Sequence, residues 1–163
     1  MSRLLAVLLA IWMSACGGGN TSESSSTTVP TVKVFGWVKF VETGPERYGV
    51  DFDEAQFLTG TEAAAAAAAD GAESPPPNDF YIRNSDPALI RYELDPSAVV
   101  ELTGEAGGGG GITMFPTTVA EWTAWTAGSG APAGWVWYGQ ALLPFWLTVE
   151  NGRVVEVTEQ YLP

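Results

Sequence analysis

The sequence predicts a mainly β domain of the α+β class, in which a small, partly open β-barrel carries one or two short helices. Three observations support this prediction: a long alternating apolar stretch at residues 32–42, several short segments rich in β-branched residues, and an Asn-Gly pair near the C-terminus. An antiparallel sheet with helices on one face uses the same elements and stays open as the alternative.

Residues 32–42 predict one long strand, because apolar side chains alternate between its two faces. Val38 and Phe40 share one face, and Trp37 lies on the other. Gly36 in the middle predicts a bulge or bend of the kind that allows a strand to serve two sides of a small barrel. The strand is therefore expected to be buried on one face and partly covered on the second.

Two short helices are predicted after this strand. Asp53, with Gln56 three places later, has the spacing of a capping box and predicts a short helix that ends before Gly60. Thr61 is expected to cap a second helix, which runs through seven consecutive alanines and ends at Gly71.

The middle of the chain predicts short strands and one more helix. The strands are expected at residues 80–83, 89–94 and 99–102, the third of which could extend the second. Thr117 or Thr118 then caps a helix that contains Trp122 and Trp125 at helical spacing and ends near Gly128.

The C-terminal segment predicts a β-hairpin, because Asn151 and Gly152 separate two β-rich runs and favour a type I′ turn. If Glu150 faces Arg153, Glu156 lies opposite an apolar residue. Glu156 is then expected at the barrel rim in contact with water or a backbone donor. A partly buried carboxylate with a raised pKa is the alternative.

The order of these elements suits a barrel of the oligonucleotide/oligosaccharide-binding type, with the alanine helix inserted after the first strand. The fold alone would not determine the function.

The N-terminus predicts a lipoprotein signal. A charged start, a ten-residue apolar run and small residues precede Cys16 and define a signal peptide over residues 1–15. Cys16 is the expected lipidation site and begins a flexible Gly/Ser/Thr tether, residues 16–31, with a root-mean-square span of about 20 Å. Residues 32–163 form the predicted globular domain, with low-complexity loops near 63–78 and 104–112.

Composition excludes several kinds of chemistry. The chain has no histidine, which removes Ser/His/Asp triads, imidazole bases and histidine-bound metals, and we expect no cofactor and no metal. Asp51, Asp53 and Glu54 bear oxygens suited to a hard cation, but helix capping explains them without one. A formal net charge of −12 opposes nucleic-acid binding and leaves the lipid as the only expected contact with the membrane.

Two short motifs support a resemblance. The segments DFYIRN at 79–84 and NGRVVEVTEQYLP at 151–163, together with VDFDEAQFLTGTEA at 50–63, resemble an uncharacterised family of bacterial lipoproteins and secreted proteins. The resemblance implies export and the limits of the domain, and it transfers no catalytic residue.

A binding surface is the best functional prediction. Its candidate residues are the aromatic side chains after a Gly/Ala/Pro loop and polar or phenolic groups in the two motifs: Trp135, Trp137, Tyr138, Tyr81, Asn84, Glu159 and Tyr161. For the three aromatic residues after the loop we favour a role in the core, and exposure for stacking or docking is the alternative. The two motifs are expected to meet and satisfy each other's hydrogen bonds. Tyr161 is expected to anchor the C-terminus in the core.

These observations predict a lipid-anchored protein on the extracytoplasmic face of the cell membrane, whose domain binds or scaffolds an envelope protein or glycan. The alternative is a hydrolase of cell-wall glycan that uses two carboxyl groups facing one cleft.

Overall fold

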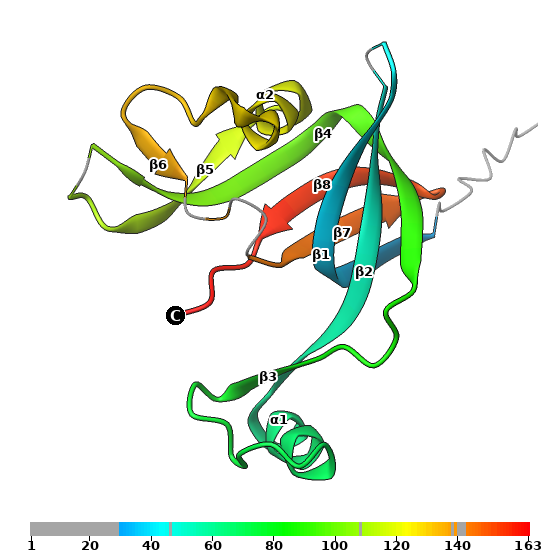
Figure 1. Ribbon diagram of the computed structural model, residues 1–163, viewed down its shortest axis with the longest axis vertical. Helices are drawn as coiled ribbons and strands as arrows, with labels where there is room; N and C mark the ends of the chain where they lie inside the picture. Colours follow the sequence, from blue (N-terminus) through cyan, green and yellow to red (C-terminus); the bar gives the residue numbers. More distant parts are fainter. Residues whose placement is uncertain (1–29, 46, 108, 138, 140–142) are drawn as a thin grey trace, which may run out of the picture.

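Five strands close into a barrel in this computed structural model, which describes residues 30–45, 47–107, 109–137, 139 and 143–163 (Figure 1). The barrel strands are β1 (Thr31–Gly44), β2 (Arg47–Thr59), β4 (Leu89–Ala106), β7 (Phe145–Glu150) and β8 (Arg153–Glu159). They follow one another around the barrel in the order β1, β2, β4, β8, β7. The predicted mainly β barrel is confirmed.

The barrel is of mixed type, because β4 and β8 run parallel and the other four pairings are antiparallel. Pairing of β2 with β4 closes it on one side, and pairing of β1 with β7 closes it on the other. Each of the five strands therefore has a paired neighbour on both sides, and the paired part of the barrel has no free edge.

The long first strand serves two sides of the barrel. Its first part, up to Gly36, pairs with β7, and the part from Phe35 onward pairs with β2. Gly36 belongs to both pairings, facing Phe145 on one side and Glu54 on the other. The strand therefore serves two sides of the barrel and changes partner at Gly36, as predicted.

A helix and a short strand lie outside the barrel. Helix α1 (Gly60–Ala69) follows β2 directly, and β3 (Phe80–Arg83) pairs with the end of β2 (Figure 1). The alanine helix is therefore inserted after the second strand, not the first. Thr59 is its N-cap residue, without a side-chain cap, so the predicted cap at Thr61 is wrong.

The predicted helix at Asp53 is also wrong, because Asp53 lies within β2. The neighbouring strands decide this: Asp53 pairs with Trp37 on one side and with Leu89 on the other. Two ladders of backbone hydrogen bonds and the burial of Phe52 outweigh a local capping signal that is worth about 1 kcal/mol.

The second half of β4 extends beyond the barrel and carries two more strands. It pairs with β5 (Ile112–Thr117) and β6 (Trp135–Trp137), so the predicted strands at 89–94 and 99–102 are one strand. Between β5 and β6 lie α2 (Val119–Ala124) and the π-helical turn η1 (Trp125–Ser129). Of the two predicted caps, Thr117 and Thr118, it is Thr118 that caps α2, through a capping box with Glu121.

The C-terminal hairpin confirms the predicted turn but corrects the predicted register. Asn151 and Gly152 have φ of 52° and 76°, as a type I′ turn requires, and Glu150 faces Arg153. An irregularity between Thr148 and Val149 then shifts the pairing by one residue. From Glu156 onward, the residues of β8 therefore face the opposite side from the one that the regular register predicts.

Glu156 is therefore not opposite an apolar residue. It faces Thr148, whose hydroxyl donates a hydrogen bond of 2.6 Å to its Oε2 atom, and it is half-buried. Glu159 lies in the apolar row instead, opposite Phe145.

The core lies inside the barrel and continues under α2. Among the described residues, the largest fully buried apolar side chains of this core come from the barrel strands other than β1, and from α2: Val50, Phe52, Val100, Leu102, Leu147, Val154, Val157, Val119 and Trp122. A smaller aromatic group outside the barrel covers the other face of β1, where Phe35 contacts Phe57 and Trp146. The predicted partial cover on that second face is confirmed.

Candidate functional site

A cavity of about 620 Å³ lies between β1, α2, η1 and the residues that begin β7. We call it the aromatic cavity, and the described residues that line it are Val38, Lys39, Phe40, Tyr48, Ala120, Trp122, Thr123, Ala124, Thr126, Ala127, Trp137 and Phe145. Its size falls within the range of about 300–1,000 Å³ that is typical of ligand pockets.

The sequence brings large and small side chains together at this cavity. Val38 and Phe40 reach it because they alternate on one face of β1. Ala120, Ala124 and Ala127 follow one another at helical spacing and leave room where larger side chains would fill the space. The cavity is therefore walled by aromatic rings on one side and by a stripe of methyl groups on the other.

Trp122 is the central ring of the cavity wall. It is fully buried and meets Phe40 edge to face, with ring centroids 4.2 Å apart, and Phe145 at 5.4 Å. Its Nε1–H group has no hydrogen-bond acceptor in the described part of the chain. A buried donor without an acceptor costs about 1–3 kcal/mol, so the indole N–H is a local cost to the stability of this wall.

The other polar side chains of the lining are Lys39, Tyr48, Thr123 and Thr126, and the two threonines are engaged. The hydroxyls of Thr123 and Thr126 donate to backbone carbonyls one turn earlier in the helix, the latter to Trp122 at 2.8 Å. The cavity therefore offers an incoming ligand apolar surface and few hydrogen-bonding groups.

Trp137 connects the cavity to a buried carboxylate. Its Nε1–H group donates to both oxygens of Glu159, at 3.0 and 3.1 Å, and the backbone N–H of Thr103 donates to Oε2 at 2.6 Å. Glu159 is 2% exposed and Trp137 is 6% exposed, so water reaches neither group freely.

The register of β4 explains why a carboxylate lies here. Strand β8 pairs with β4 as far as Glu101, and β6 pairs from Gly104 onward along the same strand. Between the two, the N–H of Thr103 finds its acceptor in the side chain of Glu159. The carboxylate therefore completes the hydrogen bonding of a strand where no neighbouring backbone does so.

Gly139 leaves the space that this carboxylate needs. A Cβ atom at this position would overlap Oε1 of Glu159, and Gly139 is itself buried. Gly139 therefore lies directly against the carboxylate, and a larger residue here would have to displace it.

Burial raises the pKa of Glu159 to about 7, against hydrogen bonds from Thr103 and Trp137 that lower it. A carboxyl group with this pKa changes its charge near neutral pH, which is a common property of functional sites.

The structure places the predicted surface residues at several separate positions. Trp137 is buried at the cavity, and Trp135 is half-buried against Phe115, with ring centroids 4.4 Å apart. Tyr138 and Cys16 lie outside the described residues.

The two motifs of the resemblance form their hydrogen bonds with different partners. The Tyr81 hydroxyl donates to Asp70, and the Asn84 amide donates to Asp53 at 2.8 Å. Glu159 bonds instead to Trp137 and Thr103, so the hydrogen bonds expected between the two motifs are not the ones these side chains form.

Tyr161 is 39% exposed and does not anchor the C-terminus in the core. The neighbouring residue has that role in part, because Gln160 accepts from the indole N–H of Trp146 at 3.0 Å and donates its own backbone N–H to Pro144.

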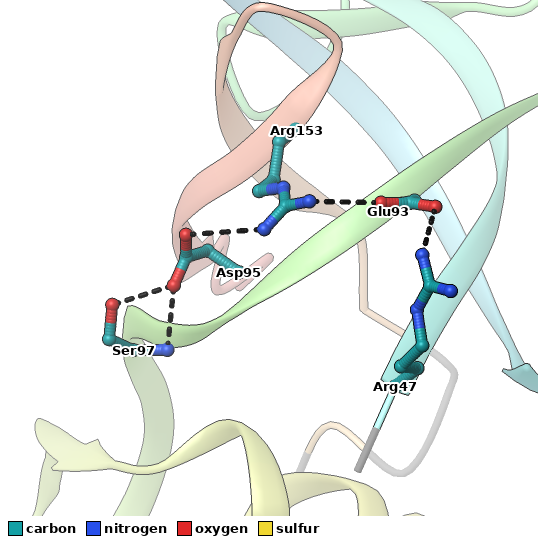
Figure 2. Close-up of polar contacts among 5 residues, drawn as sticks. All are labelled: Arg47, Glu93, Asp95, Ser97 and Arg153. Atoms are coloured by element: carbon teal, nitrogen blue, oxygen red, sulfur yellow. Dashed lines mark hydrogen bonds and ion pairs between the residues drawn. The ribbon is translucent and has the colours of Figure 1, made fainter. Parts of the chain in front are cut away.

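A cluster of charged side chains forms a second polar feature, the Glu93 network. Glu93 accepts from Arg47 at 3.2 Å and from Arg153 at 3.1 Å, and Arg153 also lies 3.8 Å from Asp95 (Figure 2). Asp95 in turn accepts from the backbone and hydroxyl of Ser97, and these bonds lower the pKa of Asp95. All of these side chains are well exposed, so the network is open to solvent.

Among the described residues, the remaining acidic side chains form no metal site of three or more ligands. Asp51 pairs with Arg91 at 2.9 Å, and Asp53 bonds to Asn84. Across the described ranges, no group of three potential ligands among Asp, Glu, His and Cys comes together.

Sequence reasoning missed the aromatic cavity and the contact between Trp137 and Glu159. The spacing of Ala120, Ala124 and Ala127 was the available signal for the cavity, because small residues on one helix face leave space. No local signal indicates that Thr103 and Glu159 meet, since they are 56 residues apart.

Comparison with known proteins adds no relative: no protein-family model matches the chain, and neither a curated protein nor a solved structure matches it significantly. Within the described residues, no helix is long and apolar enough to span a membrane.

Proposed function

We propose that this chain is a binding domain on the extracytoplasmic face of the cell membrane, anchored by a lipid on Cys16, which holds an envelope protein through an apolar group that enters the aromatic cavity. One observation carries the proposal: aromatic rings and three alanines of one helical stretch line most of a cavity of about 620 Å³.

The lining favours a protein over a glycan. A sugar ring presents several hydroxyl groups, and each needs a hydrogen-bond partner when it is buried. Thr123 and Thr126 already donate their hydroxyl protons to the helix backbone, which leaves Lys39 and Tyr48 as the other polar side chains of the lining. An apolar side chain of a protein partner matches the rest of the lining, which is apolar.

The charge of the chain agrees with a protein partner. A formal net charge of −12 repels anionic headgroups and acidic polymers, so electrostatic attraction favours a neutral or basic partner surface. Burial of one leucine-sized or phenylalanine-sized side chain in the cavity would contribute about 2–3 kcal/mol to binding.

Site-specific photocrosslinking in living cells tests this proposal. A photoreactive amino acid replaces Ala124, an exposed lining residue, or Val99, which is 56% exposed and is not part of the lining. We expect Ala124 to crosslink to an apolar segment of one envelope protein, and we expect the crosslink to disappear when Ala127→Trp fills the cavity. Equal crosslinking from Val99, persistence in the filled variant or crosslinking to glycan would contradict the proposal.

Metabolic labelling with palmitate tests the anchor separately. We expect the wild-type protein to incorporate the label and to sediment with membranes, and we expect Cys16→Ser to abolish both. Recovery of the wild type as a soluble, unlabelled protein would contradict the anchor and leave the cavity proposal intact.

A further inference from the structure

We infer that Glu159 couples ligand binding in the aromatic cavity to its own protonation, because its charged form holds Trp137 in place as part of the cavity wall. This inference rests on the proposed function and adds a regulation to the same site.

Three side chains form the connection. Trp137 lines the cavity, and its Nε1–H donates to both carboxylate oxygens of Glu159. Glu159 is attached in turn to the barrel by the Thr103 N–H at 2.6 Å. A movement of the carboxylate therefore reaches the cavity through one hydrogen-bonded contact.

The charged form fits these neighbours better than the neutral form does. Among the described residues, Trp137 and Thr103 hydrogen-bond to the carboxylate, and each does so as a donor. A charged carboxylate accepts from both, whereas a protonated one turns one oxygen into a donor and loses the charge that strengthens the bonds. Protonation therefore loosens Trp137 and, with it, one wall of the cavity.

The surrounding elements do not supply a cation that would keep Glu159 charged. In the described part of the chain, their titratable or charged groups are Arg91, Tyr92, Glu93, Asp95, Glu101 and Glu105 on β4, Glu150 on β7, Arg153 and Glu156 on β8, and Glu121 on α2. Strands β5 and β6 contribute none, and Lys39 of β1 shares the cavity lining with Trp137.

Both arginines of this set are bound elsewhere, Arg91 to Asp51, and Arg153 to Glu93 and Asp95. The balance between burial and the two N–H donors therefore determines the charge of Glu159, and burial raises its pKa to about 7.

The direction of the coupling follows from linkage. A ligand that needs Trp137 in place binds more tightly to the charged form of Glu159, and it lowers the pKa of Glu159 by the same free energy. Affinity therefore rises as the pH increases through about 7, and falls as Glu159 becomes protonated.

A neutral apolar dye, N-phenyl-1-naphthylamine, serves as the probe of the cavity, with its dissociation constant measured by fluorescence between pH 5.5 and pH 8.5. We expect the wild type to bind about tenfold more tightly at the higher pH. Glu159→Gln, which imitates the neutral acid, should bind weakly at both pH values. Glu156→Gln is the matched control on the same strand and should keep the wild-type response.

Two more variants separate the possible failures. Ala124→Trp fills the cavity and should abolish dye binding at every pH. Trp137→Phe keeps a ring in the wall but removes the N–H donor, so its affinity should not change with pH. This second variant also serves if Glu159→Gln does not fold.

The indole N–H resonance of Trp137 gives a reading without dye, and we expect it to shift with a midpoint near pH 7 in the wild type. A resonance that does not titrate, or dye binding that responds to Ala124→Trp but not to pH, would overturn the coupling alone. Absence of dye binding, or binding that Ala124→Trp leaves unchanged, would instead overturn the cavity as a binding site.

Discussion

The Glu93 network and the Glu159 site use the same carboxylate chemistry in opposite surroundings. Glu93 has two arginine partners but lies open to solvent, with half of its side chain exposed. Glu159 has hydrogen-bond donors from Trp137 and Thr103, no arginine partner among the described residues, and is almost completely buried. The comparison teaches that burial, rather than the number of ionic contacts, decides how strongly a carboxylate affects this fold.

Among the changes considered, removal of the buried Trp122 ring has the largest expected effect on the free energy of unfolding. Trp122→Ala should lower the free energy of unfolding by about 4 kcal/mol, because Trp122 is fully buried between Phe40 and Phe145. Denaturant unfolding checks this value. Arg47→Ala, an exposed change in the Glu93 network, is the control, and a comparable loss there would contradict the comparison.

The stability of the protein should fall as the pH rises from about 4.5 to above 7. The native state raises the pKa of Glu159 from 4.5 to about 7, so it binds the proton more tightly than the unfolded state. This contribution is fully present below pH 4.5 and is lost through pH 7, a change of about 3 kcal/mol.

Glu159→Gln should remove most of this dependence, whereas Glu93→Gln should retain it. Asp95 and Glu121 do not interfere, because their pKa values are lowered and they titrate below this window. Urea unfolding measured from pH 4.5 to pH 8.5 provides the test. A wild-type curve that is flat, or that rises over this range, would show that Glu159 is not the dominant carboxyl.

The barrel was predictable because it depends on local patterns that the structure retains. Alternation along β1, the bend at Gly36 and the turn at Asn151 and Gly152 each act within a few residues. Asp53 shows the limit of the same method, since its capping pattern was real but two neighbouring strands overrode it.

The site was only partly predictable, and one residue shows why. The sequence predicted Glu156 at the barrel rim and offered a partly buried carboxylate with a raised pKa only as the alternative, because the regular register pointed to Glu156. The extra residue opposite Thr148 and Val149 moves this environment to Glu159. A bulge depends on how β8 pairs with both β7 and β4, so the hairpin sequence alone does not reveal it.

A change in the hairpin turn should have an effect of intermediate size on stability. The turn leads directly into Arg153 of the Glu93 network. Gly152 has φ of 76°, a conformation that a β-branched residue adopts only with strain. Gly152→Val should therefore destabilise the protein by about 2 kcal/mol, measured by thermal unfolding. Gly152→Asn is the matched control and should cost less, since asparagine tolerates positive φ.

The smallest expected effect belongs to the side chain with the most ionic contacts. Glu93→Gln removes the charge that faces Arg47 and Arg153, yet these three side chains are 47–68% exposed. Water and salt screen such pairs, so the change should lower the free energy of unfolding by less than about 1 kcal/mol.

The loss should shrink further in 1 M sodium chloride, because the screening length falls to about 3 Å. Arg153 also keeps its contact with Asp95, which limits the loss of order at the start of β8. Urea unfolding at low and high salt measures both effects, and a loss above 2 kcal/mol that persists in salt would mean that the Glu93 network, and not the buried Glu159, carries the larger electrostatic contribution.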